Sequence, residues 1–193
     1  MPRPQTFERS EVLEKAMHVF WAQGYEATSI EDLAQATGLA RQSMYNTFGD
    51  KHAFFLETLK LYQDMQGQRM LGVLTTSRSV KEGFRRLFET IVDDAVSEIG
   101  CRGCMMVNTV TELAAHDAQI KRFADVAEAK KEDVFAEAIR RGQASGEISL
   151  EKDADALAKF LYNAVLGLRV RSTRTPEREG LETIVEMTLE VLE

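Results

Sequence analysis

The sequence has little proline and little cysteine. Of its 193 residues three are proline, at positions 2, 4 and 176, and two are cysteine. The long interval without proline leaves room for uninterrupted helices, because proline removes a backbone hydrogen bond inside a helix. Two cysteines suit a reducing cytoplasm better than a secreted fold cross-linked by several disulfides. We therefore expect a cytoplasmic protein stabilised by its hydrophobic core.

Long apolar runs and an excess of positive charge are also missing. No apolar stretch approaches the roughly 20 residues that cross a bilayer, and no signal-peptide stretch follows Met1. The formal net charge is −7, and residues 1–66 hold six Lys/Arg against nine Asp/Glu, a net of −3. Bulk charge therefore does not favour a protein that tracks phosphates. Any nucleic-acid contact has to depend on a few local cations, namely Arg3, Arg41 and Lys51.

Apolar residues recur at helical spacing, and no stretch alternates apolar and polar residues as a half-buried strand does. The fold class is therefore predicted to be all-α. Helices are expected from before Val12 to about Gly24, and over 28–38, 40–47, 51–68, 79–96, 105–113, 117–141, 153–170 and 177–193. Residues 72–79 are short, rich in hydroxyl groups and aperiodic, which makes them the best candidate boundary. They divide an N-terminal domain of residues 1–50, with a linking helix over 51–70, from a helical domain of residues 78–193.

Residues 28–51 contain the most informative motif. Thr28 with Glu31 forms a capping box for one short helix, Gly38 ends that helix, and a second short helix follows. This layout is typical of a helix-turn-helix, whose second helix enters the major groove of DNA. Arginine pairs with guanine and glutamine with adenine, so Arg41 and Gln42 are the strongest candidates for reading bases. The other polar candidates on this helix are Ser43, Tyr45 and Asn46.

The last two helices are apolar on more than one side. In residues 153–170 a core stripe that includes Phe160 and Leu161 is accompanied by Ala158, Tyr162, Leu166 and Gly167 on a second side. A helix that is apolar on two sides is expected to be buried on two sides. We therefore expect helices 153–170 and 177–193 to pair with a second copy of the chain in a homodimer.

The residues from Thr28 to Lys51 resemble the N-terminal domain of TetR/AcrR-type transcriptional regulators. The shared features are the capped helix at Thr28, Thr37-Gly38, the helix Arg41–Tyr45, Phe48 and Lys51. The remaining chain is similar in length and helix order to the effector-binding and dimerisation domain of that family. One departure is Ala40, where the family usually has a serine or threonine, so a capping oxygen worth about 1 kcal/mol is lost.

The resemblance implies a sequence-specific DNA-binding regulator without enzymatic activity, cofactor or metal. By resemblance, Tyr45 and Lys51 contact phosphates, and Thr28 and Ser29 hold the first motif helix against the DNA backbone. The operator is expected to be near-palindromic, and a repressor released by a small molecule is the leading form, although an activator is equally compatible. The effector is expected within residues 80–170, with a candidate lining of Phe84, Phe88, Met105, Met106, Phe123 and Tyr162.

Cys101 and Cys104 are separated by two residues and allow several interpretations. They are candidates for a thiol sensor of oxidants or electrophiles, for part of a metal site, or for plain structural residues. A thiol-disulfide redox protein is the alternative from another functional class, although the βαβ setting of such a motif is missing from the sequence pattern. A helical interaction protein that does not bind DNA is the second alternative.

Overall fold

The computed structural model describes residues 8–97, 100–174 and 177–193. Within these ranges the regular structure is helical and contains no strand, which confirms the all-α prediction. The α-helices are α1 (Arg9–Gln23), α2 (Ile30–Thr37), α3 (Arg41–Phe48), α4 (Lys51–Thr76), α5 (Val80–Val96), α6 (Met105–Leu113), α7 (Ala118–Ala144), α8 (Ala154–Arg171) and α9 (Arg178–Leu189). Two 3₁₀ turns, η1 (Gly100–Arg102) and η2 (Glu190–Leu192), complete the described elements. No helix in the described ranges is long and apolar enough to cross a membrane.

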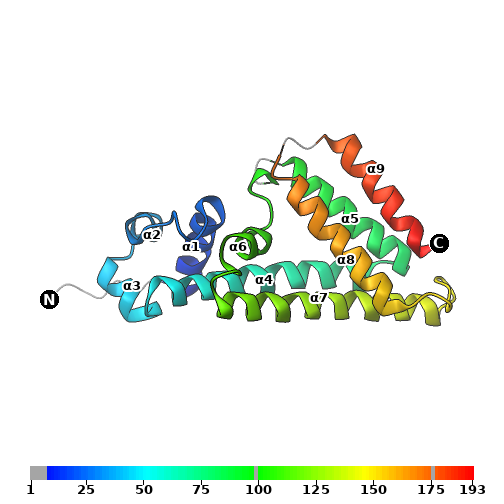
Figure 1. The fold of residues 1–193 in the computed structure, drawn as a ribbon, viewed down its shortest axis with the longest axis horizontal. Helices are drawn as coiled ribbons and strands as arrows, with labels where there is room; N and C mark the ends of the chain where they lie inside the picture. Colours follow the sequence, from blue (N-terminus) through cyan, green and yellow to red (C-terminus); the bar gives the residue numbers. More distant parts are fainter. Residues whose placement is uncertain (1–7, 98–99, 175–176) are drawn as a thin grey trace.

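The long helices α4 and α7 run side by side along much of the molecule (Figure 1). Helices α1, α2 and α3 gather at one end of α4, whereas α5, α8 and α9 lie toward the other end. Helix α6 lies between these groups, close to α4 and α7. A single pair of long helices therefore connects the helix-turn-helix to the C-terminal helices.

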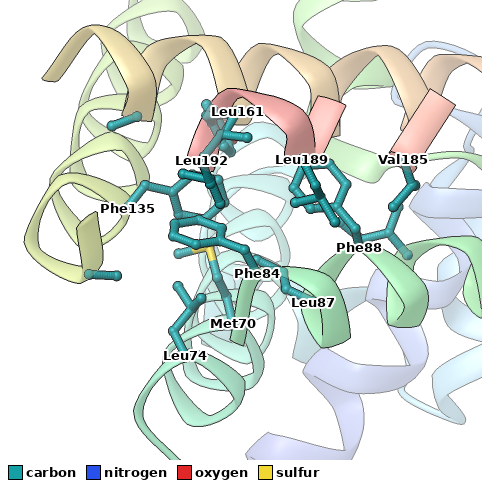
Figure 2. Close-up of a cluster of buried hydrophobic side chains, with 14 of the residues drawn as sticks. Met70, Leu74, Phe84, Leu87, Phe88, Phe135, Leu161, Val185, Leu189 and Leu192 are labelled. Carbon is teal, nitrogen blue, oxygen red and sulfur yellow. The ribbon is translucent and has the colours of Figure 1, made fainter. Parts of the chain in front are cut away.

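Buried apolar side chains form two clusters, one at each end of α4. The C-terminal cluster joins the end of α4 to α5, α7, α8 and α9, and includes Met70, Phe84, Phe88, Phe135 and Leu161 (Figure 2). The N-terminal cluster joins α1, α2, α3 and the first half of α4 to residues 104–120. Helix α6 thus packs with the N-terminal cluster, although it lies within the range predicted for the C-terminal domain.

Helix α4 is longer than the sequence pattern predicts. It was expected to end near Gln68, but it continues through the hydroxyl-rich segment to Thr76. Its last turn is accommodated because Thr75, Thr76 and Ser77 each donate a hydroxyl hydrogen bond of 2.8 Å to the carbonyl four residues earlier. Leu74 is buried in the C-terminal cluster, so tertiary packing extends the helix beyond its local signals.

The predicted core stripe of α8 is wrong at Phe160. This side chain is 49% exposed, whereas Ala158, Leu161 and Tyr162 are buried. Successive helical residues are about 100° apart around the axis. Ala158, Leu161 and Tyr162 lie on one face of the helix, and this face is buried. Phe160 lies on the opposite side of the axis and therefore points outward.

Candidate functional site

The helix-turn-helix is built by capping at both ends of α2. Ser29 accepts a hydrogen bond of 3.1 Å from the amide of Asp32, whose carboxylate accepts one of 2.8 Å from the amide of Ser29. Gly38 ends the helix with φ at +75°, a left-handed conformation that costs glycine little. Leu33, Met44 and Phe48 are buried, so α2 and α3 are held against the N-terminal cluster by their inner faces.

The prediction that Thr28 caps this helix with Glu31 is wrong by one residue. Thr28 is 1% exposed, and its hydroxyl donates to the carbonyl of Gly24 at 2.6 Å. Its side chain therefore stabilises the connection between α1 and α2. Ser29 caps α2 in its place, and its side chain is the half-exposed polar group at the start of this helix.

Helix α3 presents a polar outer face. The side chains of Arg41, Gln42, Tyr45 and Asn46 are exposed and that of Ser43 is half-buried. Arg41 donates to Glu31 at 2.8 Å, and Gln42 donates to Asn46 at 3.1 Å. Contact with Tyr45 and the charge of Glu31 raise the pKa of Arg41. Ala40 precedes this helix without a side-chain cap, as its methyl group predicts.

Lys51 begins α4 beside this face. Its ammonium lies 4.4 Å from the ring centroid of Tyr25 and 3.5 Å from the carbonyl oxygen of Glu26. Asp50 caps α4 by accepting from the amide of Ala53 at 2.7 Å. The fold therefore brings together Ser29, Lys51 and the outer face of α3. The predicted arm residue Arg3 lies outside the described residues.

Helix α6 is joined to the helix-turn-helix by contacts that sequence reasoning missed. The carboxylate of Glu112 accepts hydrogen bonds from the amides of Tyr25 at 3.0 Å and Glu26 at 2.8 Å. The indole of Trp21 donates to the carbonyl of Gly103 at 3.1 Å. Beside them His52 lies 2.6 Å from Asp117, whose pKa is lowered first by the amide of Ile120 and also by His52. These partners are 65 to 87 residues apart, so no local pattern could have paired them.

A cavity opens where α4, α5, α7 and α8 meet, with about 570 Å³ of empty space that includes some open solvent. Of the six residues predicted to line an effector site, Tyr162 lies in the wall of this cavity. The other five, Phe84, Phe88, Met105, Met106 and Phe123, are absent from its wall and pack in the two apolar clusters. The lining that sequence reasoning missed comprises Tyr62, Gln66, Arg69, Met70, Leu87, Thr90, Ile91, Lys131, Phe135, Val165, Leu166 and Arg169, together with Cys104.

Cys104 connects this cavity to α6. It is buried, precedes the first residue of α6, and accepts a hydrogen bond of 3.4 Å from the hydroxyl of Tyr62. Burial raises the pKa of Tyr62 far above its usual value, so this hydroxyl remains a donor. The side chain of Cys101 lies outside the described residues.

Positive charge dominates the polar lining of the cavity. Arg69 makes two hydrogen bonds to Asp94, at 2.7 and 3.0 Å, and Arg169 makes a third at 3.1 Å. Lys131 is half-buried with its ammonium 5.9 Å from the ring centroid of Tyr162. Among the described residues no carboxylate lies within 4 Å of Lys131.

Together, a capped α2, a glycine stop and a second helix with a buried inner face and a polar outer face define a class, the helix-turn-helix DNA-binding proteins. Residues 12–58 match the model of bacterial regulatory proteins of the tetR family, and residues 81–187 match a tetracyclin repressor-like C-terminal domain. The HTH-type transcriptional regulator YezE of Bacillus subtilis is 32% identical over the full length of both chains. The HTH-type transcriptional repressor ComR of Escherichia coli is 31% identical, over 97% of this chain and 90% of its own.

Solved structures agree with these relatives. A cysteine mutant of the TetR-family regulator CifR, complexed with 26-base-pair double-stranded operator DNA, superposes with a TM-score of 0.89 at 30% identity over 100% of both chains. Reduced NemR of E. coli shares the fold, with a TM-score of 0.87 at 16% identity over 96% of both chains. The chain belongs to the tetR family of bacterial regulatory proteins and is a DNA-binding transcriptional regulator.

Proposed function

We propose that this regulator is a cytoplasmic repressor that binds a near-palindromic operator as a homodimer and is released by a small molecule. The observation that carries the DNA-binding part is the exposed polar face of α3. Four polar side chains, Arg41, Gln42, Tyr45 and Asn46, are exposed on a helix whose inner face is buried. Because the inner face anchors the helix, the outer face is free to enter a groove.

Within this proposal Arg41 and Gln42 read base edges, while Ser43 and Asn46 contribute further polar contacts. Tyr45, Lys51 and Ser29 contact phosphates, and the amides at the start of α2 support the contact of Ser29. Thr28 acts from inside the domain, because its hydroxyl is already bonded to Gly24. Binding exchanges the Arg41–Glu31 ion pair, whose partners are 61% and 67% exposed, for contacts with DNA. That exchange costs little, because exposed pairs contribute about 0–1 kcal/mol.

The dimer forms through residues 153–170 and 177–193. Phe160, Val170 and Met187 are 49%, 51% and 63% exposed on α8 and α9. Large apolar side chains that remain exposed on the last two helices support an interface there. In a two-fold dimer the two α3 helices would lie about 34 Å apart, one turn of DNA.

Release is transmitted through α6. The cavity includes Cys104 at the start of α6, and Glu112 near its end holds the amides of Tyr25 and Glu26 just before α2. A ligand that moves Cys104 therefore moves the loop that positions α2 and α3. Ligand and operator then oppose each other with the same coupling free energy in both directions.

A thiol-reactive effector is the alternative form of the same regulation, with Cys101 and Cys104 as the sensor. Cys104 supports it, because its thiol lines the cavity. An alkylating electrophile that entered would form a carbon–sulfur bond with Sγ while its leaving group departs with the electron pair of the broken bond, and the thiol proton would pass to solvent. Operator affinity that an alkylating agent lowers equally in Cys104→Ser and the parent protein would exclude this role for Cys104.

The test of DNA binding uses the DNA that flanks the gene of this protein in an electrophoretic mobility assay. Arg41→Ala should lower affinity at least about tenfold, since a bidentate contact to a base contributes roughly 1–3 kcal/mol. Arg86→Ala is the matched control, because Arg86 is an exposed arginine on α5, far from α3 in sequence. Equal affinity of the two variants would overturn the assignment of α3.

A further inference from the structure

We propose that the cavity between α4, α5, α7 and α8 takes a small organic carboxylate with an apolar body, whose head group pairs with Lys131. This inference rests on the proposed function, because it names the class of ligand that would occupy the cavity and release the operator. The apolar part of the lining consists of Met70, Leu87, Ile91, Phe135, Val165 and Leu166. Such a wall accepts an aliphatic chain or an aromatic ring, as in most small-molecule sites.

The charges around the cavity select the head group. Arg69, Lys131 and Arg169 line it, and no carboxylate is among the lining residues. Asp94 pairs with both arginines, so these three groups together carry one positive charge. Lys131 adds a second positive charge, and no ion pair of 4 Å or less joins its ammonium to Glu128 or Glu132 of the same helix. The wall of the cavity is therefore positively charged, although the chain as a whole is acidic.

Lys131 is the group that most needs a partner. Its burial lowers its pKa, with a further decrease from Arg169 that Cys104 and Glu128 oppose. A half-buried ammonium without a paired anion carries an uncompensated desolvation cost. A ligand carboxylate removes this cost and gains a charge-assisted hydrogen bond, whereas an ammonium ligand would raise the net charge around the cavity from two to three positive charges. Gln66 and Tyr162 can donate further hydrogen bonds to an anion from the same wall.

The protein contains its own reporter of occupancy. It has one tryptophan, Trp21, whose ring centroid lies 5.2 Å from that of Tyr62, a residue of the cavity wall. Trp21 also donates to the carbonyl of Gly103, next to Cys104. Ligand binding in the cavity should therefore change the fluorescence of Trp21 without any DNA present.

The experiment titrates the full chain with two matched sets of probes. One set is phenylacetate, 2-phenylethanol and 2-phenylethylamine, and the other is hexanoate, hexanol and hexylamine. We expect the carboxylate of at least one set to bind about tenfold more tightly than its alcohol, since a hydrogen bond between charged groups contributes roughly 1.5–3 kcal/mol. The amine should bind most weakly. Equal affinity within both sets, tighter binding of the amine, or no binding of either carboxylate would overturn the proposal.

Lys131→Met removes the positive charge but keeps an unbranched apolar side chain, so it tests the charge alone. It should remove the preference for carboxylate but leave alcohol binding unchanged, and Lys131→Arg should restore the preference. Lys130→Met is the matched control, because Lys130 is exposed on the same helix and is absent from the cavity wall. A preference for carboxylate that survives in Lys131→Met contradicts the proposal. Thermal unfolding of Lys131→Met reports whether this variant is folded.

A mobility assay with the gene-flanking DNA separates this inference from the proposed function. A carboxylate that binds through Lys131 but leaves operator affinity unchanged would overturn release by this ligand and leave the ligand class standing. Operator release by an uncharged or cationic compound, with no carboxylate binding, would overturn the ligand class and leave release standing.

Discussion

At the scale of single residues, the side chains proposed to read DNA already contact neighbouring side chains in the free protein. Arg41 is paired with Glu31, and Gln42 is bonded to Asn46. These contacts hold long side chains in place before DNA arrives, which limits the side-chain entropy lost on binding. The carboxylate of Glu31 therefore lies at the edge of the surface that is proposed to contact phosphates.

Glu31→Gln should raise operator affinity about two- to fivefold, because an exposed ion pair that competes for Arg41 contributes at most about 1 kcal/mol. A mobility assay at several salt concentrations measures the gain. Glu14→Gln removes the same charge from an exposed position on α1 and serves as the control. The same gain in both variants would assign the effect to net charge instead of to Arg41.

At the scale of elements, α6 is the link between the cavity and the helix-turn-helix. Its first turn follows the buried Cys104, and Glu112 near its end holds two amides of the α1–α2 connection. Gly103 is required just before it, since φ is +67° and a Cβ atom would lie 2.4 Å from Thr173. Helix α6 is therefore held by short, specific contacts, as expected for an element that passes a structural change from the cavity to the helix-turn-helix.

Glu112→Ala should lower the free energy of unfolding by about 1–2 kcal/mol, as expected for lost hydrogen bonds to a charged acceptor. It should also reduce the fold-change in operator affinity that a cavity ligand produces. Urea unfolding and the mobility assay measure the two effects. Glu151→Ala is the control, because Glu151 is an exposed glutamate before α8 and is absent from the cavity wall. Full ligand response in Glu112→Ala would exclude transmission through this contact.

At the scale of the whole molecule, the two apolar clusters do not follow the order of the chain. Helix α4 contributes Leu59 and Tyr62 to one cluster and Met70 and Leu74 to the other. A rigid helix that belongs to both clusters couples their movements. Helices α8 and α9, which hold the proposed dimer surface, also contribute to the C-terminal cluster. We therefore expect a movement of α4 to change dimer geometry and operator spacing.

Phe160→Glu should convert the dimer to a monomer, because it places a charge at the centre of the proposed apolar interface. Light scattering after size-exclusion chromatography measures the mass, and operator affinity should fall at least about tenfold with the loss of two-site binding. Leu150→Glu changes an 80% exposed leucine in the turn before α8 and is the control. A monomeric parent protein, or a dimeric Phe160→Glu, would contradict the interface.

Local signals in the sequence were enough to predict most helices and the helix-turn-helix. Asp50, Ser79, Asp117 and Asp153 cap the helices that follow them, and Gly38 ends α2. The same signals erred at Thr28, where two neighbouring hydroxyl residues compete for one cap. They erred again at Phe160 and at the end of α4, where packing overrode periodicity.

The sequence by itself determined the all-α fold, the family and the polar face of α3, because caps, helical spacing and motif residues act over a few positions. Only the tertiary structure decided which side chains line the cavity and how α6 reaches the α1–α2 connection. Phe84 and Phe135 are both buried in the C-terminal cluster, yet only Phe135 also lines the cavity. Burial and long-range pairs such as Glu112 with Tyr25 depend on how distant helices pack, which no local pattern encodes.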